Sequence, residues 1–304
     1  MGVSLTNRRA WTLPLVFLTA CGLALGNPGD APESTYHTTV AEVQLTFSAT
    51  DQNDHGIATL QAGDFAIVDT DRIVRHPRSF QRAEFTRLEL VILVDASGSI
   101  RTQLPREIAN VTWFVNQTQG VPEENFSIVS FQRQRPTLAC AGNCRTGHAS
   151  GQLPARPEGL TPLYDSVVFA VDLLAQRADA HARKVLILLS DGEDTISQHA
   201  AADALQAAMA NEIQIYAVAT ASSSSGGESV LRRFANATGG RYYTVDDAGK
   251  VLNAVLEDFH ATYTVTYQLP SRAAGYHNVR ILPTHNLNLT FRCQGGYYYP
   301  GTVR

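Results

Sequence analysis

The chain has 304 residues, of which 44% are hydrophobic and 17% are charged, so it is globular and long enough for a main domain and a smaller one. Its formal net charge of -4 offers no basic surface for nucleic acid, and we expect no nucleic-acid partner. No internal repeat is visible.

The first residues have the order of an export signal. Two arginines precede an apolar stretch, residues 11–25, that is too short to span a bilayer comfortably. Within it, Leu18 to Cys21 is similar to a bacterial lipobox, which implies cleavage before Cys21 and lipidation of that cysteine. The alternative is cleavage after the small-x-small triplet 24–26, which would leave a soluble secreted or periplasmic protein. We predict a signal peptide at 1–21 and a cell-envelope lipoprotein held to the membrane by its lipid.

An amino-terminal β flank is predicted next. Residues 22–37 contain prolines, glycine and hydroxyl-bearing residues, which predicts a flexible tether. Apolar and polar residues then alternate at 43–48, the period of a half-buried strand, and we assign residues 38–86 to a β flank of about three strands. Within the flank, Asp51, Asn53 and Gly56 match three positions of a calcium loop. Ala62 stands where the chelating Glu belongs, so a hairpin turn is favoured.

The stretch Glu89 to Arg101 predicts a buried strand that runs into an oxygen-rich loop. Its continuous apolar run, residues 90–94, is typical of a central parallel strand that is covered on both faces. Asp95 ends the run, and Asp95, Ser97 and Ser99 then offer three oxygens at alternate positions. Such oxygens suit a hard divalent cation.

Two later loops are predicted to reach the same place. Thr161 precedes Pro162, where a helix can begin, and a second apolar run at 185–189 leads to Asp191. Ligands in open α/β sheets collect at the carboxyl ends of the strands, so the three loops can converge on one ion. Each residue alone has an ordinary role as a cap or turn residue, but their joint occurrence favours a cation site. Glu193 and Asp194 are expected to form a solvated rim.

Strands and helices alternate through residues 87–260, which predicts a doubly wound, mainly parallel α/β sheet. Two cysteines of this segment, Cys140 and Cys144, lie in a predicted long loop before Thr161, and an oxidising compartment favours a disulfide between them. His148 would make a zinc site imaginable, but the local pattern lacks a fourth ligand.

Alternating residues return at 262–269, and residues 261–304 are assigned to a carboxyl-terminal β flank. Neither flank has enough residues to bury a core alone, whereas together they provide about six strands. We therefore predict a small β-sandwich, formed by both flanks, into which the α/β domain is inserted. Cys293 is expected to be buried and free.

Asp95, Ser97, Ser99, Thr161 and Asp191 together resemble the metal-ion-dependent adhesion site of the von Willebrand factor type A domain family. The resemblance implies a Rossmann-like fold, Mg²⁺ or Mn²⁺ held by these five residues, and an open coordination position that an acidic partner residue commonly completes. With a leading segment at 43–69 and an aromatic ending at 296–300, the chain is also similar to the bacterial von Willebrand factor A-related domain of Acidobacteria. That resemblance implies an extracytoplasmic compartment.

We predict a non-enzymatic binding module that recruits a protein, or an acidic glycan, through a carboxylate bound to the metal ion. One alternative is a metal-dependent hydrolase with Ser97 or Ser99 as nucleophile. The sequence disfavours it, because the segment around Ser97 lacks the G-x-S-x-G elbow and the three loops contain no histidine. Another alternative is an envelope assembly or chaperone factor beside an ATPase, against which export argues.

Overall fold

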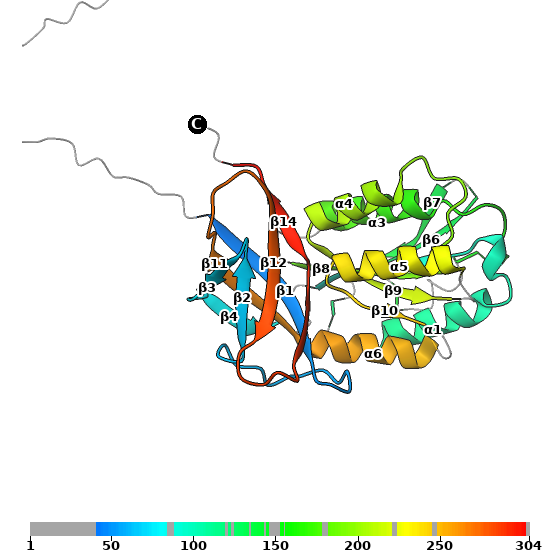
Figure 1. Ribbon diagram of the computed structural model, residues 1–304. Helices are drawn as coiled ribbons and strands as arrows, with labels where there is room; N and C mark the ends of the chain where they lie inside the picture. Colours follow the sequence, from blue (N-terminus) through cyan, green and yellow to red (C-terminus); the bar gives the residue numbers. More distant parts are fainter. Residues whose placement is uncertain are drawn as a thin grey trace, which may run out of the picture. The chain divides into compact units, whose positions relative to one another are not determined.

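The computed structural model describes residues 41–83, 88–118, 121–122, 125–133, 135–142, 144–145, 153–154, 156–177, 182–220, 224–244 and 248–301 (Figure 1). The predicted signal peptide with Cys21, the predicted tether and His148 lie outside these residues. None of the described helices is both long and apolar enough to cross a membrane.

The α/β domain is built on one six-stranded sheet, in the order β10-β9-β8-β5-β6-β7. Its neighbours are parallel except for β6 and β7, which run antiparallel, so the predicted doubly wound, mainly parallel sheet is confirmed. The strands are β5 (Leu88–Asp95), β6 (Phe126–Gln132), β7 (Arg135–Ala141), β8 (Arg183–Ser190), β9 (Ile213–Ala219) and β10 (Tyr242–Tyr243).

Helices cover both faces of this sheet (Figure 1). The central strand β5 shows why its apolar run is continuous: Leu90, Ile92 and Val94 enter the core under α1 and α6, whereas Val91 and Leu93 enter the core under α3, α4 and α5. The helices are α1 (Leu104–Gln117), α3 (Leu163–Arg177), α4 (Ala201–Ala210), α5 (Ser225–Ala237) and α6 (Ala248–His260), and a short 3-10 helix, η1 (Gly98–Ile100), precedes α1.

The two flanks form a β-sandwich, as predicted. One sheet has the order β13-β1-β11-β4 and the other β14-β12-β2-β3, and aromatic residues such as Phe47, Phe65 and Tyr263 fill the core between them. The strands are β1 (Glu42–Thr50), β2 (Phe65–Asp69), β3 (Arg72–Val74), β4 (Ser79–Arg82), β11 (Thr262–Gln268), β12 (Gly275–Pro283), β13 (Thr290–Cys293) and β14 (Gly296–Tyr299).

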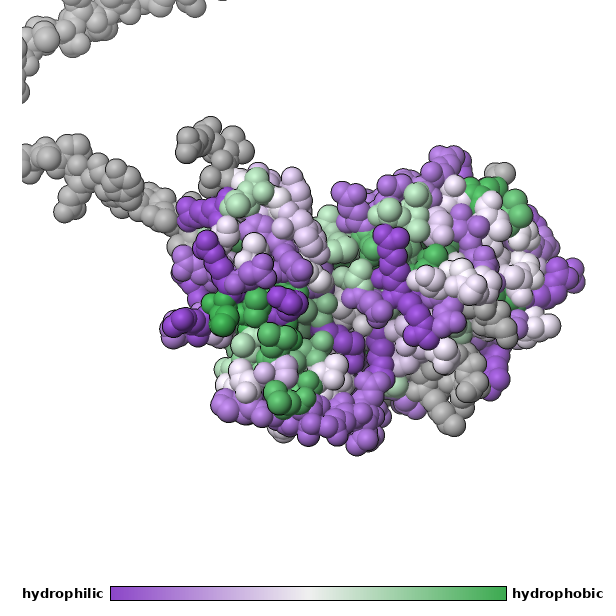
Figure 2. Space-filling model, in the orientation of Figure 1, coloured by the Kyte–Doolittle hydropathy of each residue, from purple (hydrophilic) through white to green (hydrophobic). Residues whose placement is uncertain are grey.

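Within the described residues the sandwich has eight strands, where about six were predicted. The difference arises from strands of three or four residues, too short to show a periodic pattern; the segment 73–80, for example, divides into β3 and β4 around Pro77. The favoured hairpin turn is present, because a carboxylate oxygen of Asp51 accepts the backbone N–H groups of Asn53 and His55 at 2.8 and 2.9 Å. Figure 2 shows a mainly hydrophilic surface, with hydrophobic residues gathered on the sandwich.

The α/β domain leaves and re-enters the sandwich at neighbouring strands. Arg82 at the end of β4 pairs with Tyr263 at the start of β11, and the N–H of Ala83 donates to the carbonyl of Thr262 at 2.8 Å. The domain is therefore an insertion between two paired strands.

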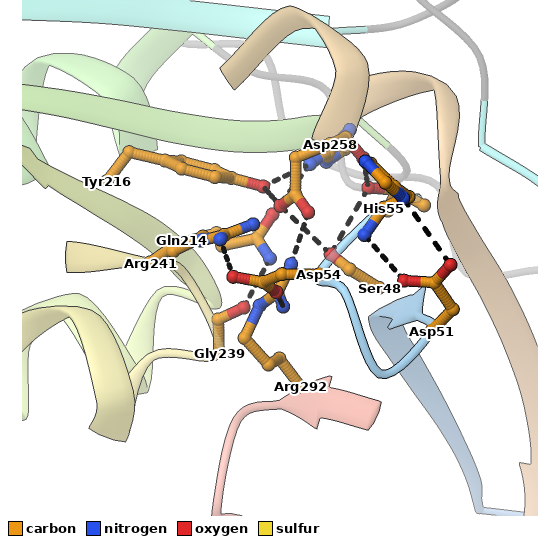
Figure 3. Close-up of polar contacts among 12 residues, drawn as sticks. Ser48, Asp51, Asp54, His55, Gln214, Tyr216, Gly239, Arg241, Asp258 and Arg292 are labelled. Atoms are coloured by element: carbon orange, nitrogen blue, oxygen red, sulfur yellow. Dashed lines mark hydrogen bonds and ion pairs between the residues drawn. The ribbon is translucent and has the colours of Figure 1, made fainter. Parts of the chain in front are cut away.

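A buried polar cluster joins the inserted domain to the sandwich (Figure 3). Asp258, near the end of α6, is only 3% exposed and accepts hydrogen bonds from the Tyr216 hydroxyl at 2.6 Å and the Ser48 hydroxyl at 3.3 Å. It also forms an ion pair with Arg292 of β13, and Arg292 reaches Asp54 at 3.5 Å. The last helix is thus fixed to two strands of the sandwich.

One part of the predicted long loop is a strand. β7 pairs with β6 and contains Cys140, whose side chain forms a disulfide with Cys144. A disulfide leaves neither sulfur free as a thiolate ligand for zinc. Cys293 is free, as expected, but its side chain is half-buried where a buried one was expected. Burial still raises the pKa of its thiol to about 11.

Candidate metal centre

The predicted metal residues lie at the carboxyl edge of the α/β sheet, on three loops. β5 and β8 are parallel neighbours, with Val94 opposite Leu189, so the residues that follow each strand emerge side by side. Asp95 ends β5, and Asp191 follows β8 directly. The loop between them in sequence, the second of the three, carries Thr161, which lies two residues before α3 begins.

The Asp95 carboxylate is held in place by the loops around it. It is completely buried, and its Oδ1 accepts the N–H of Ser97 at 2.8 Å while its Oδ2 accepts the Ser190 hydroxyl at 2.8 Å. The hydroxyl oxygens of Ser97 and Ser99 lie 3.0 Å apart. Ser97 is buried and Ser99 is exposed, so this loop offers oxygens from the interior out to the surface.

Backbone hydrogen bonds bring the second loop against the first. The N–H of Glu158 donates to the carbonyl of Ala96 at 3.2 Å, and that of Gly98 donates to the carbonyl of Gly159 at 3.3 Å. Gly159 has φ +78°, and a Cβ there would lie 2.9 Å from the Cγ of Arg133, so glycine is needed at this position. The approach of the two loops brings the buried Thr161 to the same edge.

The third loop holds Thr161 from the other side. The Thr195 hydroxyl accepts the N–H of Thr161 at 2.8 Å, and the N–H of Thr195 donates to the carbonyl of Thr161 at 2.9 Å. Asp194 accepts the N–H of Tyr164 at 3.3 Å, and Asp165 in turn accepts the N–H of His199 at 2.9 Å. The bond from Tyr164, together with one from the N–H of Asp165 to the Ser197 hydroxyl at 3.1 Å, satisfies two N–H groups in the first turn of α3.

Glu193 and Asp194, the expected solvated rim, also hold the third loop in place. Asp194 is half-buried and serves as a cap of α3, and Glu193 is half-buried and accepts a hydrogen bond from the Ser224 hydroxyl, just before α5. That neither residue is a metal ligand stays a prediction. Both carboxylates fix the third loop to neighbouring helices.

The edge has a strongly negative character. Burial raises the pKa of Asp95 to about 6; hydrogen bonds from Ser97 and Ser190 act against this shift, and the charge of Asp191 adds to it. Burial also raises the pKa of Tyr164, with further contributions from Asp194 and Glu193. Among the described residues, neither Asp95 nor Asp191 forms an ion pair with a basic side chain.

The residues present fit a hard divalent cation. Two buried carboxylates, Asp95 and Asp191, that have no basic partner among the described residues would gain from a bound positive charge. The accompanying donors are hydroxyl oxygens, which Mg²⁺ and Mn²⁺ accept readily. In the described part of the chain, no cluster of three His, Cys, Asp or Glu side chains suited to a metal is found. The site we describe has two carboxylates and three hydroxyls.

Sequence reasoning missed two residues of this site. Ser190 directly precedes Asp191, and its position opposite the end of β5 could have indicated a contact with Asp95. Thr195 carries no such signal, because its role depends on how the loop folds back over Thr161.

Comparison with known proteins supports the fold. The family model of the von Willebrand factor type A domain matches residues 89–258, more than half of the chain. No curated protein matches the sequence significantly.

Solved structures similar to this chain share little sequence with it. A von Willebrand factor type A protein from Catenulispora acidiphila is 13% identical, with 87% of this chain and 76% of that chain covered and a TM-score of 0.43. A manganese-loaded TRAP protein from Plasmodium vivax is 16% identical, covering 72% and 98%, with a TM-score of 0.43. The conserved hypothetical protein BatB from Bacteroides thetaiotaomicron is 13% identical, covering 56% and 96%, with a TM-score of 0.44. From the family match across residues 89–258, this chain belongs to the von Willebrand factor type A domain family.

Proposed function

We propose that this protein is a binding module that recruits an acidic group of a protein partner through a divalent cation at the carboxyl edge of its α/β sheet. Membership of the von Willebrand factor type A family supports an interaction module. The observation that carries the metal dependence is the pair of buried carboxylates, Asp95 and Asp191, which lie at one edge without a basic partner among the described residues.

In this proposal Mg²⁺ or Mn²⁺ is held by Asp95, Ser97, Ser99, Thr161 and Asp191. The bound ion would supply an open coordination position for a carboxylate of the partner. The chain's own residues do the rest: the two carboxylates balance the charge of the ion, and the hydroxyl groups fix its place on loops that are already bonded to each other.

The rim of the site favours a protein over an acidic glycan as the partner. Leu160, directly before Thr161, is 51% exposed, and Ser99, on the loop that is hydrogen-bonded to Gly159, is exposed as well. An exposed leucine next to a polar centre suits the apolar side chains that surround a carboxylate in a protein interface.

Titration calorimetry with Mn²⁺ tests the metal site. We expect the wild-type protein to bind one ion and Asp95→Ala to lose this binding. Because the buried Asp95 carboxylate has a raised pKa, its removal should not unfold the metal-free protein. Asp172→Ala is the matched control, because Asp172 is an exposed aspartate farther along α3. Equal Mn²⁺ affinity in wild type and Asp95→Ala would overturn the site.

The partner chemistry is tested separately with an oligo-glutamate peptide as the probe. We expect it to bind the Mn²⁺-loaded protein, and we expect a chelator to abolish binding. Binding that survives the chelator would contradict the role of the ion. Panels of ester, phosphoester and peptide substrates test the hydrolase alternative, since metal-dependent turnover lost in Ser97→Ala would replace the binding function with catalysis.

We further propose that the protein is exported and held to the membrane through a lipid on Cys21. The support is the sequence order of Arg8 and Arg9, the apolar stretch and the lipobox-like residues 18–21, all outside the described residues. Intact-mass measurement of the native protein should show an acylated chain that begins at Cys21. A mature chain that begins at Asn27 without lipid would refute the anchor.

A further inference from the structure

A cleft of about 730 Å³ lies between the sandwich and the α/β domain, away from the metal centre. Arg183 and Lys184, at the start of β8, line it, whereas the metal loops follow the other end of the same strand. The eight residues of β8 span about 25 Å, so the two sites lie at opposite edges of the sheet. In Figure 2 the two parts of the molecule meet near the centre of the view. The volume of the cleft is in the range of pockets that bind small molecules.

One wall of the cleft is the outward face of β1 and β11. Cross-strand neighbours Gln44 and Thr266, and Thr46 and Thr264, stand on this face, while the residues between them point into the sandwich core. These four side chains form no hydrogen bond with any other described residue. The wall is therefore a row of free hydroxyl and amide groups.

The same face continues under the α/β domain, and there its hydroxyls are occupied. Ser48 lies opposite Thr262, both are completely buried, and the Ser48 hydroxyl donates to Asp258 in the cluster of Figure 3. The polar face thus has one end that contacts protein and one end that is left open in the cleft. The open end has the hydrogen-bonding capacity of the occupied end without a protein partner among the described residues.

The opposite wall adds polar groups with little net charge. Gln214 is buried, donates to the carbonyl of Gly239 at 2.6 Å and accepts from Arg183 at 2.7 Å. The Arg183 guanidinium also lies over the Phe259 ring, 4.8 Å from its centroid. Two acidic and three basic residues line the cleft, so their charges nearly balance: Glu42, Glu212, Arg82, Arg183 and Lys184.

Tyrosines from β14 close the third side. Tyr297 is held by a hydrogen bond from its hydroxyl to Asp69 at 2.7 Å, and the side chain of Tyr298 is 72% exposed. β14 is the edge strand of its sheet, so the exposed Tyr298 borders the cleft at that edge. A tyrosine ring offers an apolar surface with a polar tip, which suits the mixed faces of a sugar ring.

We propose that this cleft binds a neutral, hydroxyl-rich ligand, namely an uncharged oligosaccharide, with Thr46, Thr264 and Thr266 as hydrogen-bonding groups and Tyr298 as the stacking surface. The near balance of charge disfavours a strongly ionic ligand. A peptide is less suited, because β1 and β11 are inner strands whose backbone groups are already paired, and peptides commonly bind by adding a strand to a free edge. β14 and β4, which each lie at the edge of a sheet, are the lining strands with which an extended peptide could pair.

Calorimetry with the full chain tests the proposal against uncharged hexasaccharides: a β-1,4-glucan, an α-1,4-glucan and a chitin oligosaccharide. We expect at least one to bind, with unchanged affinity in the presence of a chelator. The double variant Thr264→Val and Thr266→Val keeps the shape and strand preference of both residues and should weaken binding at least about fivefold. Tyr298→Ala, an exposed site whose loss should not unfold the sandwich, should weaken it similarly.

Thr290→Val is the matched control, because Thr290 is an exposed threonine of the same sheet that does not line the cleft. It should leave saccharide affinity unchanged. The proposal is overturned if none of the hexasaccharides binds at millimolar concentration, or if binding survives both the threonine and the tyrosine variants. Binding that a chelator abolishes would assign the saccharide to the metal centre, and extended peptides that bind in place of saccharides would make the cleft a peptide site at its edge strands, β14 or β4.

Discussion

Glu107 should make the stability of this protein depend on pH. It lies on the buried face of α1 with Leu104, Val111 and Phe114, and it is only 2% exposed. Its Oε2 has no hydrogen-bond partner among the described residues. Burial raises the pKa of the carboxyl to about 7 from an ordinary value of 4.5, and the neighbouring Arg106 offsets only part of this shift.

The size of the effect follows from the shift. A rise in the pKa of this carboxyl from 4.5 to about 7 corresponds to about 3 kcal/mol. Since the folded chain holds this proton more tightly than the unfolded chain, the favourable contribution is fully present below pH 4.5. It is lost as the pH rises through the folded pKa of about 7.

Glu107→Gln should remove this dependence, because the amide has the shape of the protonated acid and carries no charge. In urea unfolding with a chelator present, we expect the variant to be more stable than wild type by up to about 3 kcal/mol at about pH 8 and nearly equal to it at about pH 4.5. Glu228→Gln, on the exposed face of α5, is the control and should change stability by about 0.5 kcal/mol or less at either pH. The reasoning is refuted if Glu107→Gln shows the same difference from wild type at both pH values.

Three further substitutions test other contacts. Thr195→Val removes the hydroxyl that accepts the N–H of Thr161, so Mn²⁺ affinity measured by calorimetry should fall about tenfold and Thr195→Ser should restore it; an unchanged affinity in Thr195→Val would contradict the positioning role. Arg292→Met leaves Asp258 buried without its cation and should cost about 3 to 5 kcal/mol in urea unfolding, a prediction that a loss below about 1 kcal/mol would exclude. Cys140→Ser with Cys144→Ser opens a short loop and should lower stability by about 2 kcal/mol, whereas unchanged unfolding would show that the disulfide constrains little.

The inner strands of the α/β sheet could be predicted because a strand that is buried on both faces has an uninterrupted run of apolar residues. Leu90 to Val94 and Val185 to Leu189 are apolar at every position, and both runs are covered on two faces. The position of the two candidate metal carboxylates could be predicted for a related reason: Asp95 ends one such strand and Asp191 follows shortly after the other, so the parallel order of the strands brings both to one edge.

β7 could not be predicted in this way, because a bulge breaks its alternation. The register of the β6–β7 pair shifts between Ile128 and Val129, so Ala139 and Cys140 are both buried although they are neighbours, and Leu138 is 42% exposed. A strand with this pattern has the periodicity of neither a half-buried nor a fully buried element.

The buried polar cluster around Asp258 and the cleft could not be predicted from the sequence either. Ser48, Tyr216, Asp258 and Arg292 come from four separate elements, and none of them belongs to a local motif. Their contacts exist only after the sandwich and the α/β domain have packed together. The same holds for the cleft, whose walls are ordinary half-polar strands until the inserted domain stands opposite them.

The insertion between β4 and β11 also sets the order in which the chain can fold. β1 pairs with β11 and β13, so its sheet cannot be completed until residues 290–293 have been synthesised. A disordered segment from 83 to 261 would make that pairing a slow, long-range search. Once the α/β domain has folded, its two ends lie at neighbouring strands, and the search becomes a short one. We therefore expect refolding in two kinetic phases, with the sandwich forming last on the folded insertion as its template.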